Sequence, residues 1–294
     1  MRRFLLAACA LLVLGTAACA APKGTDGNLV DDWPALPAPK VPEPAVGACW
    51  KTTAWAAYEQ LAFEYTLPAD CATEHHMETV HVGQVPADLA SSTQVPSALQ
   101  LSQVYRECEP AAEKYLGGAW QTGRVYLYLH PTTAAQWRGG ARFYRCDVAT
   151  VDSEADHLVP QTGTLKDSLR PGGPRAIGCG NQVVRDKKIV DLTPTACTDP
   201  HDTELVGYAR RPDVQTIPPD YKGIEAIFKS ECEAQLLAYT GMSASHYARQ
   251  PVGIITWVTT NNHGWTAGDH SARCYLITNK KLTRSLKSAG NVAV

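Results

Sequence analysis

Apolar residues recur at helical spacing in two separate stretches of the chain. The first stretch contains Leu101, Val104, Cys108, Ala112 and Tyr115, and the second contains Ile224, Phe228, Cys232, Leu236 and Tyr239. A proline precedes each stretch and a glycine follows it, which are ordinary start and stop signals of a helix. The pattern therefore predicts two helices, each with its cysteine on the buried face.

Strand-like segments follow each predicted helix. The segments "RVYLYLH" and "VGIITWVTT" are rich in β-branched and aromatic residues, and "ARFYRCDV" and "SARCYLIT" come after a polar loop in each case. Such segments, bounded by polar loops, are typical of antiparallel strands.

The same features occur twice in the same order. The spacing Cys-x3-His-x2-Glu appears first, then the helix with a Tyr seven residues after its Cys, then a Trp-x-x-Gly loop, and finally Ser-Leu followed by a basic residue (Cys71, His75, Glu78, Tyr115, Trp137, Gly140, Ser168–Arg170; Cys197, His201, Glu204, Tyr239, Trp265, Gly268, Ser285–Lys287). This order indicates a tandem duplication with a connector at 171–176. We expect an α+β fold of two tandem disulfide-braced modules, residues 46–170 and 176–288, each one main helix packed on a small antiparallel sheet.

The amino terminus has the pattern of an export signal. Arg2 and Arg3 precede the apolar run from Phe4 to Leu14, and small residues lead to Cys19. We expect a signal peptide at residues 1–18 and a lipid anchor on Cys19, as in a palmitate-bearing lipoprotein, followed by a Pro-rich tether at 19–45. Cleavage after Ala18-Cys19-Ala20 is the alternative and would release a secreted protein.

An exported chain carries its cysteines oxidised. Beyond Cys9 and Cys19 there are four cysteines in each repeat, an even number that fits a disulfide framework. Sequence alone leaves the pairing open, and our hypothesis joins nearest neighbours in each repeat (Cys49 with Cys71, Cys108 with Cys146, Cys179 with Cys197, Cys232 with Cys274).

The repeated features resemble the septum-formation domain family of actinobacteria. The resemblance rests on the Gly-Cys or Gly-x-Cys openings, on "CTDPHDTELVG", on the cysteine in each helix and on the cysteine in each last strand. Glu74 stands in the first repeat where the second has Pro200. The resemblance implies an extracytoplasmic envelope protein associated with cell division or wall growth, and it supplies no catalytic residues.

The His-x2-Glu pairs have two interpretations. A His oriented by a carboxylate is half of a nucleophile-activating site, but the chain has no Gly-x-Ser-x-Gly or Ser-x-x-Lys motif to supply the other half. Residues three apart on a strand point to opposite faces unless a turn intervenes. We therefore expect the His to bond the turn after the Cys while the Glu faces solvent, with no catalytic residue.

A metal site is a second possibility for this region. His75, His76 and His81 form the densest His cluster in the chain, but the second repeat keeps only one of these positions. No H-E-x-x-H motif or Asp-rich calcium loop is present. We expect a His-rich surface strand, no metal and no cofactor.

The Trp-x-x-Gly loops are the candidate binding sites. Trp137 lies near Arg142, and Trp265 lies near His270 in the polar run "TTNNHGWTAGDH". An exposed aromatic ring beside hydrogen-bond donors suits stacking on a sugar or anchoring a partner protein. The alternative is that both rings fold back onto the core between helix and sheet.

Composition narrows the function. Hydrophobic residues make up 45% and charged residues 19% of the chain, as in globular proteins, and the net charge of -2 without a basic cluster argues against nucleic acid. We expect a membrane-anchored, non-enzymatic protein on the outer face of the cell membrane that binds an envelope or divisome protein or a cell-wall glycan. The rivals are a cell-wall hydrolase or transferase using a His/Glu pair, and a secreted solute- or metal-binding protein.

Overall fold

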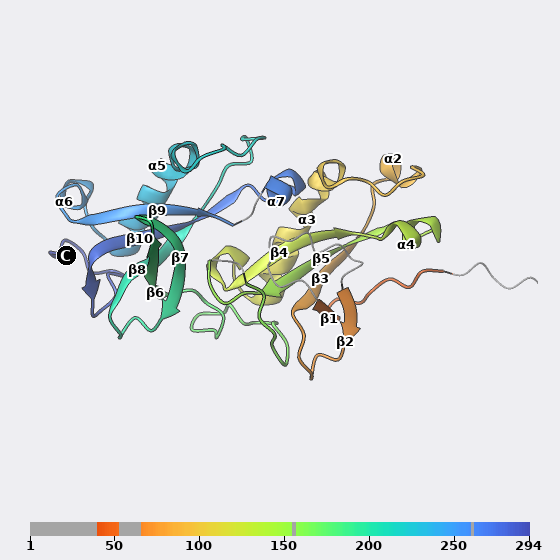
Figure 1. Cartoon of the computed structure of the whole chain (residues 1–294), viewed down its shortest axis with the longest axis horizontal. Helices are drawn as coiled ribbons and strands as arrows, with labels where there is room; N and C mark the ends of the chain where they lie inside the picture. The colour runs from red at the N-terminus through yellow and green to blue at the C-terminus, as the bar shows by residue number, and fades with distance from the viewer. Residues whose placement is uncertain (1–39, 53–65, 155–156, 260–261) are drawn as a thin grey trace, which may run out of the picture. The chain divides into compact units, whose positions relative to one another are not determined.

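The computed structural model describes residues 40–52, 66–154, 157–259 and 262–294, and the expected signal peptide, Cys19 and the tether up to residue 39 lie outside these ranges. The fold is mixed helix and sheet, with two antiparallel sheets (Figure 1). The first sheet has the strand order β2-β1-β3-β5-β4 (β1 Cys49–Thr52, β2 Thr66–Ala69, β3 Met77–Gln84, β4 Val125–Pro131, β5 Phe143–Thr150).

The second sheet repeats this order with the next five strands. Its order is β7-β6-β8-β10-β9 (β6 Cys179–Arg185, β7 Lys188–Thr195, β8 His201–Arg210, β9 Val252–Val258, β10 Ser271–Leu282). The strand that carries the last cysteine, β5 or β10, is fourth in the order of its sheet and has a shift in register beside that cysteine. We call the part of the chain that forms the first sheet the first half, and the part that forms the second sheet the second half.

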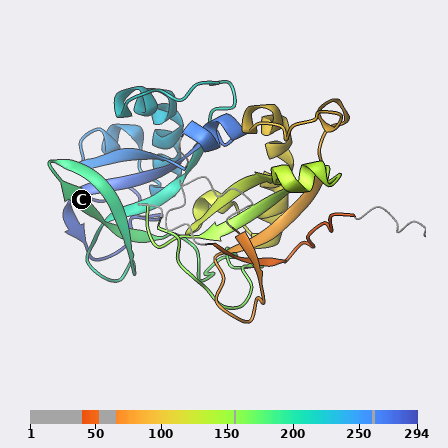
Figure 2. The same cartoon turned by 45° about the vertical axis from the view of Figure 1, so that its right-hand side comes forward.

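One long helix packs on each sheet, accompanied by short helices. Helix α3 (Ala98–Leu116) contacts β3, β4 and β5, and α5 (Tyr221–Thr240) contacts β8, β9 and β10 (Figure 2). The short helices lie before α3 and around the loops (α2 Ala87–Ala90, η3 Trp120–Thr122, α4 Ala134–Arg138, α6 Ala244–Tyr247, α7 Asn262–Ala267). In the described residues no helix is long and apolar enough to cross a membrane.

Both long helices begin and end where the sequence predicts. Ser97 caps α3 in a capping box with Gln100, and the side chain of Asp220 accepts from the backbone of Gly223 at the start of α5. Both helices end at a glycine in the left-handed conformation, Gly117 at φ 78° and Gly241 at φ 73°.

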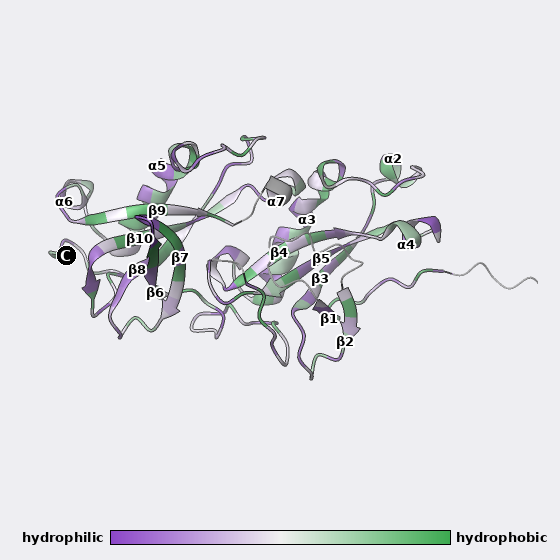
Figure 3. Ribbon diagram, in the orientation of Figure 1, coloured by the Kyte–Doolittle hydropathy of each residue, from purple (hydrophilic) through white to green (hydrophobic). Residues whose placement is uncertain are grey.

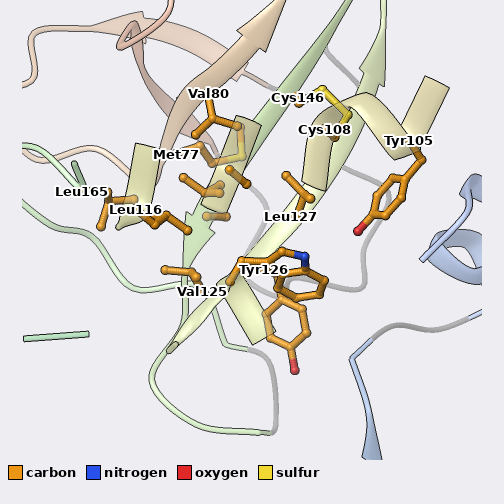
Figure 4. Packing of buried hydrophobic residues seen from close by; sticks show 14 of the residues in the cluster. Met77, Val80, Tyr105, Cys108, Leu116, Val125, Tyr126, Leu127, Cys146 and Leu165 are labelled. Atoms are coloured by element: carbon orange, nitrogen blue, oxygen red, sulfur yellow. A yellow bond between two sulfur atoms is a disulfide. The ribbon is translucent and has the colours of Figure 1, made fainter. Parts of the chain in front are cut away.

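The helices bury the faces that their apolar spacing predicts. Leu101, Cys108 and Ala112 are fully buried on α3, and Phe228, Cys232 and Leu236 on α5. Hydrophobic residues of the helices and the strands that they cover meet in one core in each half. Figure 3 shows that hydrophobic and hydrophilic residues are interspersed along these helices and strands. Figure 4 shows part of the first core, where Met77 lies beside Val80, and which also contains Leu127 and the disulfide bond of Cys108.

A third cluster lies on the other face of the second sheet. Leu192 of β7 packs with Leu205, Ile255 and Tyr275 of the strands β8, β9 and β10. Because β7 and β9 are opposite edges of this sheet, the cluster extends from one edge of the sheet to the other.

Four disulfide bonds brace the two cores. They join Cys49 to Cys71, Cys108 to Cys146, Cys179 to Cys197 and Cys232 to Cys274. The expectation of disulfide bonds is thus confirmed. In each half one bond ties the first strand to the turn before the His, and the other ties the long helix to the strand that carries the last cysteine, β5 or β10.

Candidate functional site

The first His-x2-Glu pair forms a buried contact. His75 lies in the segment before β3, and its Nδ1 is 2.9 Å from the carbonyl oxygen of Thr73, to which it donates. Its Nε2 is 3.2 Å from Oε1 of Glu78, and both side chains are fully buried. The expected bond from His to the turn is present, but the expectation that Glu78 faces solvent is wrong.

The carboxylate of Glu78 holds several segments together. Its Oε1 accepts from the backbone N–H of Leu165 at 2.7 Å and from the Gln161 amide at 2.9 Å. Its Oε2 accepts from the Tyr115 hydroxyl at 2.7 Å and from the Thr164 hydroxyl at 3.1 Å. One side chain therefore joins strand β3 to the end of helix α3 and to the loop after β5.

The second half repeats this arrangement. Nδ1 of His201 is 2.8 Å from the carbonyl oxygen of Asp199, and its Nε2 is 3.3 Å from Oε1 of Glu204. Glu204 accepts from the Tyr239 hydroxyl at 2.7 Å, from the Ser285 hydroxyl at 2.6 Å and from the backbone N–H of Leu286 at 2.8 Å. We call each set of a buried Glu and its donors a carboxylate staple.

The staples correct the sequence comparison of the two repeats. Thr164-Leu165-Lys166 in the first half occupies the place of Ser285-Leu286-Lys287 in the second. The motif Ser168–Arg170 is therefore not the counterpart of Ser285–Lys287. The tripeptide Thr-Leu-Lys was the available signal, since Thr and Ser both supply a hydroxyl donor.

Burial and the neighbouring carboxylates shift the tyrosines of both staples. Burial, and then the hydrogen bond to Glu78, raise the pKa of Tyr115 to about 12, against the opposing bond from Thr164. The pKa of Tyr239 is raised by the same causes, with Glu204 as the carboxylate. Both hydroxyls therefore stay protonated at neutral pH and remain donors to the carboxylate.

Each staple lies beside a disulfide bond, and the oxidation state of its cysteine determines whether these residues can bind a metal ion. The ligand atoms of Cys49, His75 and Glu78 lie within 4.8 Å of one another, as do those of Cys179, His201 and Glu204. The thiolate is the metal-binding form of cysteine, and these sulfurs are in disulfide bonds. In the oxidised protein the two donor sets do not fit a metal ion.

The other histidines of the first cluster do not converge with His75. His76 is half-buried, its Nδ1 lies 3.4 Å from the backbone N of Thr52, and burial lowers its pKa. His81 lies 3.7 Å from the carboxylate of Glu107. The expectation of a His-rich surface strand holds for the partly exposed His81 and fails for His75, which the core encloses.

The Trp-x-x-Gly loops have buried tryptophans. Trp137 and Trp265 are each 2% exposed, and their indole N–H groups donate to the carbonyl oxygens of Ser92 and Val214. Arg142 lies 3.9 Å from the centre of the Trp137 ring, and His270 stacks on Trp265. Both rings fold back onto the core, so neither Trp137 nor Trp265 is exposed for stacking on a ligand.

A buried ion pair joins the two halves and was missed from the sequence. The guanidinium of Arg273 lies 2.8 Å from Oε1 of Glu154, and the Tyr275 hydroxyl donates to the same carboxylate at 2.6 Å. Arg273 also donates to three backbone carbonyl oxygens of the first half (Gln121, Gly123, Val125). The only sequence signal was that Arg145 and Arg273 each directly precede the last cysteine of their repeat.

Arg145, the counterpart of Arg273, is used within the first half. Its Nε donates to Oδ2 of Asp147 at 2.6 Å, and its guanidinium stacks on Trp50 at 3.8 Å. Gly180 stands in the second half where the first has Trp50, since both follow the first cysteine of their repeat. Equivalent positions in the two halves therefore serve different contacts.

A model of a protein family, described as septum formation, matches residues 46–274. The chain belongs to the septum-formation family. No curated protein and no solved structure matches it. The family indicates a role related to cell division, and together with the disulfide bonds it indicates an extracytoplasmic protein. The septum-formation match covers the first sheet and the first carboxylate staple, and in the second half it reaches Cys274 in β10, before Ser285 and Leu286 of the second staple.

Proposed function

We propose that this protein is an exported, lipid-anchored component of the cell envelope, built from two tandem septum-formation modules, that binds a division or wall-growth partner without catalysis. The match to the septum-formation family over most of the chain is the observation that carries this proposal. The partner is an envelope or divisome protein or a cell-wall glycan.

Three kinds of agreement between the halves support a tandem origin. The two sheets have the same strand order, and the disulfide bonds join equivalent cysteines in each half. The two carboxylate staples use the same donors, a Tyr at the end of the long helix, a hydroxyl residue and the N–H of the next Leu. A tertiary contact of this detail is a stronger argument than spacing along the chain.

The surroundings of the His/Glu pairs support a binding rather than a catalytic role. A general acid or base must come within hydrogen-bond reach of the substrate proton that it moves. Glu78 and Glu204 are fully buried, and both oxygens of each carboxylate already accept protein hydrogen bonds. Carboxylates that are enclosed in this way stabilise the fold, whereas the catalytic His and Glu of a hydrolase must be within reach of the substrate.

The amino-terminal pattern supports export and anchoring. A basic start, an apolar run and small residues before Cys19 are the features of a lipoprotein signal, and oxidised cysteines fit the compartment outside the cytoplasm. A single acyl chain gives only reversible membrane binding, so stable anchoring at Cys19 needs a second chain or a second contact.

Imaging in dividing cells tests the proposal. A tag that fluoresces outside the cytoplasm is fused to the carboxyl terminus of the chain. It is joined through a flexible linker because the backbone N–H of Val294 donates to the side chain of Gln250. The control is the same fusion with Cys19→Ala. We expect enrichment at the septum in the parent protein, and release from the membrane in the Cys19→Ala protein.

Each other outcome of the imaging overturns one part of the proposal. A uniform envelope signal contradicts the division role, because the family name then does not describe where this protein acts. Retention of the Cys19→Ala protein at the membrane contradicts the lipid anchor while leaving the division role in place.

A further inference from the structure

The two Trp-x-x-Gly loops are equivalent in position but differ in what they contact. In each, the indole is buried in its own half, and a glycine with positive φ follows three residues later, Gly140 at φ 91° and Gly268 at φ 113°. The two glycines differ in what lies against the outer side of the loop, the side that faces away from the half to which the loop belongs.

Gly268 of the second half lies directly against helix α3 of the first half. A Cβ built on Gly268 would be 2.9 Å from Cβ of Tyr105 and 3.0 Å from the carbonyl oxygen of Ser102. Helix α7, which precedes Gly268, packs on α3, and Arg210 of β8 pairs with Glu109 of α3 at 3.1 Å. This loop and the outer face of α3 therefore form an interface between the two halves of the chain.

Within the part of the chain that the structure describes, Gly140 of the first half has no such neighbour. A Cβ built there would have none of the described atoms within 4 Å, and Arg138, Gly139 and Gly140 are exposed. The loop keeps the shape that in the second half contacts a helix, because Thr133 caps α4 in a capping box and Arg142 holds the turn through the carbonyl oxygens of Trp137 and Ala90.

Helix α5 of the second half offers the face that would match this loop. Counted from the helix cysteine, Ser102, Tyr105 and Glu109 of α3 correspond to Ala226, Lys229 and Glu233 of α5. Ala226 and Lys229 are exposed. The contacts of Gly268 use a backbone oxygen and a Cβ, which Ala226 and Lys229 also supply.

We propose that the chain binds further copies of itself head to tail, the loop at Gly140 of one molecule packing on the outer face of helix α5 of the next. The interface repeats between molecules the contact that Gly268 makes with α3 within one molecule. The inference rests on the equivalence of the halves in the proposed function.

The polar residues around the Gly140 loop favour its packing on helix α5 of another molecule. Gln84 stands in the first half where Arg210 stands in the second, since each pairs with the residue three before the last cysteine of its repeat. Gln84 is exposed, and its amide nitrogen donates one hydrogen to Glu43 at 2.9 Å. The second hydrogen of this amide is the donor that fits Glu233 as Arg210 fits Glu109. Ala141 stands in the first half where the second half has Asp269. The proposed contact therefore places no carboxylate at this loop position against Glu233.

An interface of this kind joins two different surfaces and leaves one of each unused at the ends. Such heterologous contacts form open chains unless the rotation closes them into a ring. A linear assembly on the membrane surface would multiply weak partner contacts along its length, which is a physical advantage at a growing septum.

Sedimentation velocity of the full exported chain, oxidised and over a range of concentrations, tests the proposal. Gly140→Arg blocks the loop and Ala226→Arg blocks the helix face. Gly163→Arg is the control for the first, because Gly163 also has positive φ and open space around it. Ala238→Arg is the control for the second, since it is exposed and about 18 Å further along the same helix.

We expect the average mass of the parent chain and both controls to rise with concentration beyond that of a dimer, and each blocked variant to remain a monomer. An equal mixture of Gly140→Arg and Ala226→Arg keeps one intact surface of each kind and should form dimers and nothing larger. This result also shows that both variants are folded.

Two results would overturn the inference. One is a parent chain that stays monomeric at every concentration, and the other is a mixture of the blocked variants that forms no dimers while the controls associate. If the tagged protein is still enriched at septa in either case, the proposed function stands and only self-association fails.

Discussion

The buried carboxylates of Glu78 and Glu204 are the single side chains from which we expect the largest contributions to stability. Glu78→Gln or Glu204→Gln places an amide N–H₂ against donors that need an acceptor, and leaves His75 or His201 without its carboxylate. We expect each substitution to lower the free energy of unfolding by about 3 kcal/mol, as for leaving buried hydrogen-bond donors without their acceptor. Urea unfolding of the oxidised protein measures this loss.

Glu74→Gln is the matched control for these substitutions. Glu74 lies one residue before His75 and is exposed, so its replacement should change the free energy of unfolding by less than about 0.5 kcal/mol. If Glu78→Gln and Glu204→Gln were as mild as this control, the carboxylate staples would not be what holds the helix ends to the sheets.

Asp269 gives the stability of the protein a pH dependence of its own. Burial raises its pKa to about 6, against hydrogen bonds from Ser271 and Thr259 and the charge of Arg273. The folded pKa is above the unfolded value of about 4, so this carboxyl adds stability when protonated and loses that contribution as pH rises through about 6. The loss is on the order of 2 to 3 kcal/mol.

Asp269→Asn removes this titration while keeping an acceptor for the N–H of Ser271. We expect the difference in free energy of unfolding, variant minus parent, to increase between about pH 4 and pH 7. Urea unfolding at several pH values measures it. A difference that stays constant across this range would show that Asp269 does not titrate with the raised pKa.

Helices and loops show most clearly which parts of the structure follow from sequence. The helical spacing of Leu101, Cys108 and Ala112 and the paired turn signals predict both long helices, because these elements depend on local pattern. The burial of Glu78 does not follow from the same kind of reasoning. It depends on Gln161 and Leu165, far along the chain, which supply donors that the period-two rule for strands ignores.

The outer sides of the two Trp-x-x-Gly loops can be compared by one substitution. Gly268→Ala and Gly140→Ala both place a Cβ on a backbone with positive φ, but only Gly268 has Tyr105 and Ser102 within about 3 Å. We expect Gly268→Ala to cost about 1 to 3 kcal/mol more than Gly140→Ala, the range of an overpacked contact. Thermal and urea unfolding at low protein concentration give both values.

Equal losses for the two variants would contradict this comparison. The strain of positive φ is common to both, so a difference near zero would mean that α3 yields to the added methyl group, and that Gly268 is not closely packed on the first half. The intermolecular contact inferred for Gly140 would then lose its template.

The joint between the halves determines how the complete chain unfolds. Arg273 and Glu154 lie 119 positions apart, and Arg273 reaches backbone carbonyl oxygens of the first half as well as this carboxylate. No local pattern marks such a pair, because the contact exists only once both halves are folded. A buried, fully hydrogen-bonded pair of this kind couples the stabilities of the two halves.

Calorimetry tests this coupling. We expect the parent chain to unfold in a single transition, and Arg273→Met to unfold in two, because removing the guanidinium leaves Glu154 buried with Tyr275 as a remaining donor and weakens the joint.

Arg284→Met is the control, since Arg284 is exposed and belongs to the second half but not to the joint. It should keep the single transition of the parent. Two transitions in the parent chain would show that the halves fold independently, whereas one transition in Arg273→Met would show that apolar contacts such as Gly268 on α3 suffice to couple them. The order of melting then decides which half is the more stable scaffold, and therefore which surface a partner bound at the septum would reinforce.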